Sequence, residues 1–373
     1  MGSRHDRTSE FLAARSVKQP QLARSSPTPA PESAAAGESA ATDPLSDVLR
    51  TVKLTGALFF RLDVSSPWVV EVPHASVFSP IILPGAQHVI SYHIVAQGSG
   101  WVSRPADPPV RFAVGDVLVF PHGDPYAMLS APNEHHEQNV EGALDFFRAM
   151  AAGELPFVVA EGGGGAERAQ FVCGFLGCDA RPFNPLLATL PDFLQVRRPA
   201  GATDDLLDRL IELTLAEGRM HRAGGQCIRL RLSELMFVEV VRRYLEALPA
   251  DHTGWLAGLR DPGIGRVLAL LHERPAHAWT LDELARQVGM SRSVLADRFM
   301  HLVGQPPMQY LTRWRIQVAA RLLADGAQKV AAVAAEVGYA SEAAFSRAFK
   351  KLTGVSPASW RKRCADALAG RDS

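Results

Sequence analysis

Two short segments carry side chains that could hydrogen-bond to nucleic-acid bases from equivalent places. The first, "GMSRSVLADRFMHLVGQPPMQY", covers residues 289–310, and the second, "GYASEAAFSRAFKKLTGVSPASW", covers residues 338–360. The residues that we expect to point outward are Ser293, Ala296 and Asp297 in the first segment and Ala343, Ser346 and Arg347 in the second. Hydroxyl, carboxylate and guanidinium groups can read base edges in the major groove of DNA. Because the two sets differ, they could read two different base sequences.

The skeleton that would hold these side chains is the same in both segments. With one residue inserted in the second copy, the matching pairs are Gly289 and Gly338, Ser291 and Ser341, Leu295 and Phe345, Phe299 and Phe349, Gly304 and Gly354, and Tyr310 and Trp360. Glycine suits a tight turn, and serine suits a helix N-cap whose first amides can meet a phosphate. We therefore predict a helix-turn-helix in each copy. The alternative is a plain helical bundle with a duplicated packing unit.

A long helix, predicted from Pro307 to a stop at Gly326, joins the two copies. A helix of about 20 residues is roughly 30 Å long, which is close to the spacing of about 34 Å between successive major grooves. The two copies could therefore enter successive grooves of one duplex.

Charge is unevenly distributed along a chain whose formal net charge is zero. Residues 258–363 hold 16 Lys and Arg against 8 Asp and Glu, whereas the rest of the chain holds 23 against 31. A basic third on an otherwise acidic protein favours a polyanionic partner for that third. An ordinary solvated surface would have the same composition, so charge alone does not decide.

The chain divides by composition into five parts, and its length of 373 residues suits two globular domains with tails. Residues 1–43 are rich in Ser, Ala and Pro and are predicted to be a disordered tail. Residues 44–200 contain short runs of Val, Ile, Phe and Tyr between turn residues, which predict a small β-barrel or sandwich. Residues 201–257 predict two amphipathic helices that connect the domains, dimerise, or do both. Residues 258–363 predict an all-α domain, and 364–373 a second tail.

The sequence favours a cytoplasmic protein. No apolar run reaches the length of about 18 residues that spans a bilayer, and the first residues lack the apolar stretch of a secretory signal. The four cysteines are sparse and fit no zinc spacing. Cys173 and Cys178 flank a glycine turn, so they could form a disulfide on oxidation if they lie on adjoining strand ends. Buried structural thiols are the alternative.

The region 258–363 resembles the DNA-binding domain of the AraC/XylS family of bacterial transcription regulators, most specifically in "AAEVGYASEAAFSRAFKKLTGVSPASWRK". The resemblance implies recognition helices at 291–301 and 341–352. It places seven residues at groove-facing positions, namely Ser293, Ala296, Asp297, Glu342, Ala343, Ser346 and Arg347. We expect six others to contact phosphates, namely Ser291, Arg298, Ser341, Lys350, Lys351 and Arg361. Many members have Arg or Gln at the position of Asp297, where an aspartate could accept from cytosine N4.

The strand-rich region resembles the cupin-type sensor domain that a subset of these regulators carries. The resemblance rests on "HVISYHIVAQGSGWV" and "GDVLVFPHGDPYAML". It implies an effector pocket near His88, His93 and Tyr126. Some cupin-bearing relatives sense oxidants through cysteines, which would give Cys173 and Cys178 a redox role.

Enzymatic cupins usually hold a metal with about three histidines and a carboxylate. Here Tyr126 stands where the second motif normally offers a histidine, and no glutamate follows His93 at the usual spacing. His74 and His122 could approach the same place, and the cluster "NEHHEQ" (133–138) is expected to be a solvated loop. We predict no cofactor, with a metal-dependent dioxygenase or isomerase fused to a DNA-binding domain as the alternative.

The whole sequence predicts a multidomain α+β protein, with a cupin-like β-barrel before an all-α domain of two helix-turn-helix units. We expect a transcription factor and not an enzyme, acting as an activator or a repressor in response to a small molecule or an oxidant. Its expected partners are double-stranded promoter DNA, RNA polymerase, a small-molecule effector and a second copy that docks through residues 203–248, with no membrane.

Overall fold

The computed structural model describes residues 43–51, 54–105, 107–134, 139–178, 182–197, 205–218, 222–249, 251–326 and 328–369. The predicted disordered tail lies outside the described residues except for Asp43, and so do residues 370–373. No helix in the described part is long and apolar enough to cross a membrane.

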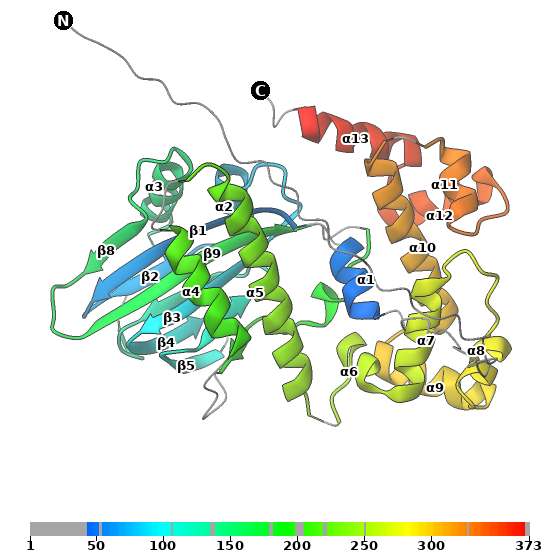
Figure 1. Cartoon of the computed structure of the whole chain (residues 1–373), viewed down its shortest axis with the longest axis horizontal. Coiled ribbons are helices and arrows are strands. Elements are labelled where there is room, and N and C mark those ends of the chain that lie inside the picture. Colours follow the sequence, from blue (N-terminus) through cyan, green and yellow to red (C-terminus); the bar gives the residue numbers. More distant parts are fainter. Residues whose placement is uncertain are drawn as a thin grey trace, which may run out of the picture. The chain divides into compact units, whose positions relative to one another are not determined.

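Strands of the N-terminal half form two sheets (Figure 1). They are β1 (Leu54–Ser65), β2 (Val69–Val72), β3 (His88–Gln97), β4 (Ser99–Arg104), β5 (Asp107–Ala113), β6 (Val117–Phe120), β7 (Tyr126–Leu129), β8 (Val158–Gly162), β9 (Arg168–Cys178) and β10 (Leu194–Val196). The larger sheet has the order β10-β6-β3-β9-β1-β8, and the smaller one β2-β7-β4-β5. All pairings are antiparallel except β1 with β8.

The two sheets pack face to face around an aromatic core. Phe171 of the larger sheet meets Phe112 of the smaller one with 5.7 Å between ring centroids, and the Trp68 ring lies 5.5 Å from the Phe171 ring. Two packed sheets of this kind are typical of a jelly roll. The predicted cupin-like domain is confirmed, with the difference that its strands form two open sheets and not a closed barrel.

Strand β9 is buried on both faces, because side chains of a strand alternate between its two sides. Phe171, Cys173 and Phe175 belong to the core between the sheets. Val172 and Leu176 belong to a second core, which lies between the larger sheet and the helices that cover it. A strand buried on both sides reads as a continuous apolar run, which explains the sequence "FVCGFLGC".

Short helices interrupt the strands, and the sequence analysis did not predict them. They are α1 (Pro44–Thr51), α2 (Ala75–Ile82), α3 (Val140–Ala151) and the 3₁₀ turn η1 (Leu187–Thr189). Each α-helix is only two or three turns long, so its apolar periodicity is hard to separate from that of a strand. Phe147 of α3 stacks on Phe78 of α2 at 4.4 Å, which packs the two helices together.

Two longer helices, α4 (Leu206–Gly218) and α5 (Gly225–Ala247), lie across the larger sheet (Figure 1). Tyr92 of β3 passes over Gly174, where a side chain would overlap its ring, and its hydroxyl lies 3.2 Å from Ser233 Oγ of α5. The predicted amphipathic helices are thus present, and the predicted start near Thr203 lies outside the described residues.

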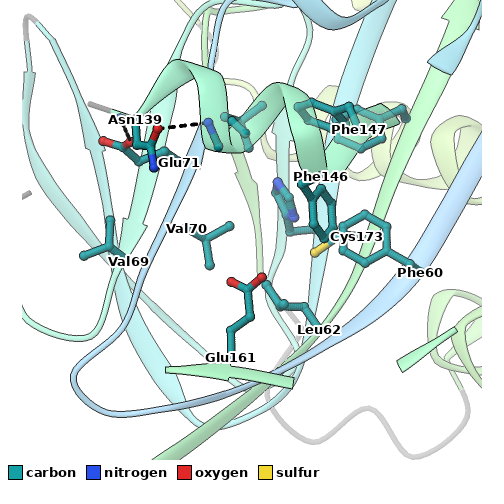
Figure 2. Close-up of a pocket in the computed structure, with 15 residues that line it drawn as sticks. Phe60, Leu62, Val69, Val70, Glu71, Asn139, Phe146, Phe147, Glu161 and Cys173 are labelled. Atoms are coloured by element: carbon teal, nitrogen blue, oxygen red, sulfur yellow. Dashed lines mark hydrogen bonds between the residues drawn. The ribbon is translucent and has the colours of Figure 1, made fainter. Parts of the chain in front are cut away.

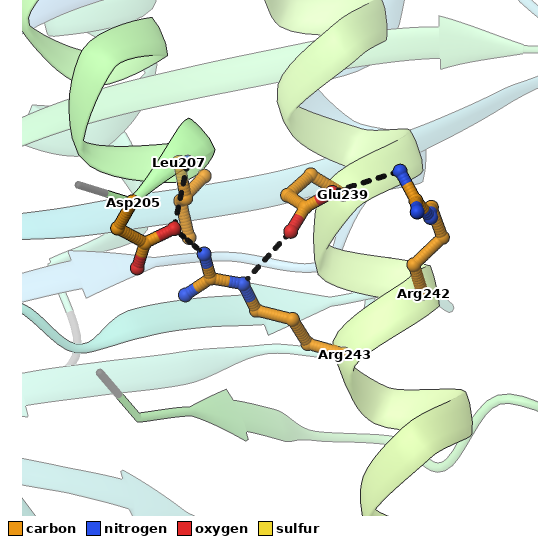
Figure 3. Close-up of polar contacts among 5 residues, drawn as sticks. All are labelled: Asp205, Leu207, Glu239, Arg242 and Arg243. Atoms are coloured by element: carbon orange, nitrogen blue, oxygen red, sulfur yellow. Dashed lines mark hydrogen bonds and ion pairs between the residues drawn. The ribbon is translucent and has the colours of Figure 1, made fainter. Parts of the chain in front are cut away.

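An ion-pair network fastens α4 to α5 (Figure 3). Arg243 of α5 binds Asp205 at the start of α4, and its Nε donates to Glu239 Oε1 at 3.1 Å. The same Asp205 carboxylate accepts from the Leu207 amide at 3.1 Å and so caps α4. Arg242 reaches the other oxygen of Glu239 from the solvent side, at 3.4 Å.

The C-terminal third is all-helical, as predicted. Its helices are α6 (Trp255–Arg260), α7 (Pro262–Glu273), α8 (Leu281–Gln287), α9 (Arg292–Val303), α10 (Pro307–Ala324), α11 (Val330–Glu336), α12 (Glu342–Thr353) and α13 (Pro357–Ala369). Helices α8 and α9 form the first helix-turn-helix, and α11 and α12 form the second (Figure 1).

Helix α10 belongs to two cores at once. Its first half places Tyr310, Leu311 and Trp314 in the core that also holds the first helix-turn-helix. Its second half places Ile316 and Leu323 in a separate core with the second. Each helix-turn-helix unit therefore packs against a different half of the predicted joining helix.

The segment after β9 contacts α10 directly. The Phe183 amide donates to the buried side-chain oxygen of Gln317 at 2.9 Å. The guanidinium of Arg313 lies 4.4 Å over the Phe183 ring, and Tyr310 meets that ring edge-on at 5.6 Å. The segment between β9 and β10 of the strand-rich domain thus packs on the helix that carries both helix-turn-helix units.

Candidate nucleic-acid interface and effector cavity

Helix α9 is fixed by its caps and by its buried face. Ser291 accepts from the Val294 amide at 3.3 Å, and Gly304 ends the helix at a φ of 77°, a left-handed conformation that favours glycine. Leu295 and Phe299 are fully buried, which leaves the opposite face of the helix open to solvent.

Helix α12 repeats this design residue for residue. Ser341 accepts from the Ala344 amide at 3.2 Å, Gly354 ends the helix at a φ of 78°, and Phe345 and Phe349 are fully buried. The sequence repeat therefore encodes caps and core contacts, as its pairing predicted.

The predicted base-facing residues lie on the open faces of these two helices. Exposed members of the set are Ser293, Asp297, Glu342, Ala343 and Arg347, and half-buried members are Ala296 and Ser346. Such side chains can reach a groove, and their contact with bases stays a prediction.

The six predicted phosphate contacts fall into two groups. Lys350 and Lys351 are exposed at the end of α12, and the two capping serines are exposed as well. Arg298 instead binds Asp261 through two nitrogens, at 2.5 and 2.7 Å. Arg361 donates to the Gln328 carbonyl at 2.5 Å. Arg298 and Arg361 thus already make hydrogen bonds within the domain, and contact of any of the six residues with phosphate stays a prediction.

A cavity of about 420 Å³ opens into the strand-rich domain (Figure 2). Its apolar wall includes Phe60, Leu62, Val70, Phe146, Phe147 and Phe175. Its polar groups are Glu71, His93, Asn139, Glu161 and Cys173. Sequence reasoning placed His93 in the pocket and singled out Cys173 only as a redox candidate. It missed the residues that α3 and β8 supply, because those elements lie outside both cupin motifs.

His93 is 1 % exposed and belongs to the cavity wall. Its Nε2 lies 2.5 Å from the hydroxyl of Tyr126, whose ring stacks on Phe120 at 3.4 Å. Burial lowers the pKa of His93 to about 3 and raises the pKa of Tyr126, so both groups are neutral at pH 7. His93 Nδ1 makes no hydrogen bond within the described residues.

The predicted pocket trio is thus only partly brought together. His93 and Tyr126 meet, whereas His88 donates from Nε2 to the Pro121 carbonyl at 2.5 Å and lines no cavity that we describe. Its hydrogen bond closes the turn after β6, and its role as a pocket residue stays a prediction.

The histidines near the cupin motifs do not fit a metal centre. His74 caps α2, and His122 bonds the Leu190 carbonyl at 2.8 Å. Within the described ranges, no three His, Cys, Asp or Glu side chains gather as a metal site. Of the "NEHHEQ" cluster, residues 135–138 lie outside the described part.

Cys173 and Cys178 do not lie on adjoining strand ends, so the condition for a disulfide between them is not met, and both thiols are buried, as the other interpretation held. Both belong to β9, five residues apart, and face different cores. Five residues of strand span roughly 16 Å, far beyond the reach of a disulfide. Burial, and next the negative charge of Glu161, raise the pKa of the Cys173 thiol, which keeps it protonated and poorly nucleophilic.

Comparison with known families gives two matches. A cupin family model matches residues 43–246, and a helix-turn-helix domain model matches residues 284–363. The first match extends through α4 and α5, so it treats these helices together with the two sheets.

Similar proteins cover nearly the whole chain. A Streptomyces antibioticus protein described as an AraC-like transcription regulator is 33% identical over 86% of this chain and 98% of its own. The RCS-specific HTH-type transcriptional activator RclR of Escherichia coli is 25% identical over the same shares. Among solved structures, the DNA-binding domain of AdpA in complex with a target DNA is 33% identical, with a TM-score of 0.27, over 28% of this chain and 92% of that chain.

Proposed function

Because this chain belongs to the AraC-like transcription regulators that carry an N-terminal cupin domain, we propose that an effector in the cupin cavity controls how it binds a promoter. The protein is a sequence-specific DNA-binding transcription factor. His74, His88 and His122 each hydrogen-bond to a different partner and do not gather as the ligands of a catalytic metal. This arrangement supports regulation in place of catalysis at the cupin site.

The observation that carries the DNA-binding part of this proposal is the matched pair of recognition helices, one at each end of α10. Both are N-capped by serine, buried on one face and open on the other. The 18 residues of α10 span about 27 Å. A separation of this order suits two successive major grooves on one face of the duplex, so each protomer should cover about two helical turns.

A small molecule is the better-supported effector. The domain holds a cavity large enough for one. An oxidant is less well supported, because the two candidate cysteines face different cores and the Cys173 thiol is protonated. The hydrogen bond between the Phe183 amide and Gln317 of α10 would connect a change in the cupin domain to the DNA-binding helices.

We also propose that the protein works as a homodimer through α4 and α5. Leu206 and Leu213 of α4, and Ile228 and Leu235 of α5, stand seven residues apart in each helix and are each about half exposed. Apolar side chains at this spacing form a stripe that suits helix–helix docking.

The double variant Leu213→Glu with Leu235→Glu should shift a dimeric mass to a monomeric one in light scattering. A monomeric mass for the unaltered chain would contradict the dimer.

The experiment that tests the regulatory function is footprinting of the full chain on the promoter region beside its own gene, followed by transcription with RNA polymerase. We expect protection of about two helical turns per protomer and a change in transcript level. Protection of a single half-turn would contradict the paired reader. Equal affinity for this region and for random DNA would contradict sequence-specific regulation there.

A further inference from the structure

The cupin cavity has an unusual balance of charge for a cavity with an apolar wall. Glu71 and Glu161 are acidic, and neither lysine nor arginine occurs among the lining residues that the structure describes. Figure 2 shows the Glu161 carboxylate pointing from β8 into the cavity, toward Cys173. The carboxylate of Glu71 is held at the start of α3, where it accepts from the Asn139 amide at 2.9 Å.

A carboxylate ligand would be disfavoured in this cavity. It would meet the like charge of Glu161 and would lose its water, with no lysine or arginine among the described lining residues to pair with it, which is costly for an ionised group. A protonated amine has the opposite balance, because the acidic side chains attract it and the faces of the Phe60 and Phe146 rings can stabilise a cation.

His93 provides a polar contact deep in the same cavity. Its Nδ1 is buried and has no hydrogen-bond partner within the described residues. A neutral imidazole has one donor and one acceptor nitrogen. When Nε2 donates to the Tyr126 oxygen, Nδ1 is left as an acceptor, which suits an N–H group of a ligand. Buried polar atoms are normally paired, so this nitrogen points to a ligand that completes the site.

We propose that the cavity binds an apolar amine, meaning a molecule with a hydrophobic body and a protonated amino group, and discriminates against apolar acids of equal size. The amine would be the effector of the proposed regulator, so this assignment rests on that function. Glu161 would attract the ammonium group, His93 would accept from it, and the phenylalanine wall would hold the body.

The test uses three probes with one carbon skeleton, 4-phenylbutylamine, 4-phenylbutan-1-ol and 4-phenylbutanoic acid, titrated into the full chain at pH 7 by calorimetry. We expect the amine to bind best and the acid worst. Glu161→Gln should weaken the amine by about three- to tenfold, as an exposed carboxylate contributes modestly, and should leave the alcohol unchanged.

Two further variants localise the effect. Glu167→Gln removes an equally exposed carboxylate from the same stretch of chain, outside the cavity, and should change nothing. Phe146→Ala should weaken all three probes, and the amine most, because the half-buried Phe146 ring contacts the common body and its face can also stabilise the ammonium group.

Three results would overturn the assignment: an acid that binds as well as the amine, a Glu161→Gln chain with an unchanged ratio of amine to alcohol, or no binding of any probe. Promoter binding in the same preparations separates the two proposals. Intact promoter binding without amine binding would reject the effector class and leave the regulator standing. Amine binding that leaves promoter binding unchanged would support the cavity's selectivity and reject its regulatory role.

Discussion

At the scale of single residues, Arg347 is the sharpest candidate for reading a base. It is exposed in the middle of α12, whereas Arg298 and Arg361 are hydrogen-bonded to other residues of the domain. Arg347→Ala should weaken operator binding by about 1–3 kcal/mol and leave binding to random DNA almost unchanged. Lys351→Ala should instead weaken both equally, as a phosphate contact does. Gel-shift titrations with both DNAs would show the contrast, and unchanged operator affinity of Arg347→Ala would contradict base reading.

Two buried histidines should make the fold sensitive to acid. Burial lowers the pKa of His93 and that of His272 to about 3, below the ordinary value of 6.5. Between these values the unfolded chain takes up protons that the folded chain does not, so stability is complete above pH 6.5 and falls as the pH drops toward 3.

The pH effect can be assigned to each histidine by substitution. When the pH falls from 7.5 to 5.5, each buried histidine should lower the free energy of unfolding by about 1.4 kcal/mol. His93→Gln and His272→Gln should each remove that share of the pH dependence, measured by urea unfolding at both pH values. His301→Gln, at an exposed position, is the control. An equal pH dependence in all four proteins would contradict the assignment.

At the scale of elements, the pairing of α4 with α5 depends on Arg243 more than on its neighbour. Arg243 is 13% exposed and bridges Asp205, which is 6% exposed, to Glu239, whereas Arg242 is 56% exposed and touches Glu239 alone. Arg243→Ala leaves a buried carboxylate without its partner and should cost about 3 kcal/mol. Arg242→Ala should cost less than about 0.5 kcal/mol. Denaturant unfolding compares the two variants. Similar losses of unfolding free energy would contradict a special role for the buried ion pairs of Arg243.

The elements also show how far the sequence can predict this fold. The repeat predicted both recognition helices down to their capping serines and glycines, because caps and core contacts depend on residues close in the chain. The short helices α2 and α3 were not predicted, since two or three turns carry too few apolar positions to reveal their period.

The cavity was predicted less well than the DNA-binding face. His93 and Tyr126 were placed together correctly, yet Glu161 and Phe146 come from elements that meet β3 only through the tertiary fold. The sequence also did not reveal that Cys173 and Cys178 share one strand. The glycines between them were interpreted as a turn, but both belong to β9, and Gly174 leaves room for the Tyr92 ring.

At the scale of the whole molecule, a single strand separates the cavity from the helices proposed to dimerise. One face of β9 lines the cavity with Cys173 and Phe175, and the other packs Val172 and Leu176 beside α5. Substitutions at consecutive residues of this strand should therefore cause different defects. In a saturation library, changes at 173 and 175 should alter the dose of effector that induces the promoter. Changes at 172, 174 and 176 should lower the amount of folded regulator at every dose. Plotted along the gene, the two defects should alternate with a period of two codons, and a single smooth gradient would show that the two sides of β9 do not act separately.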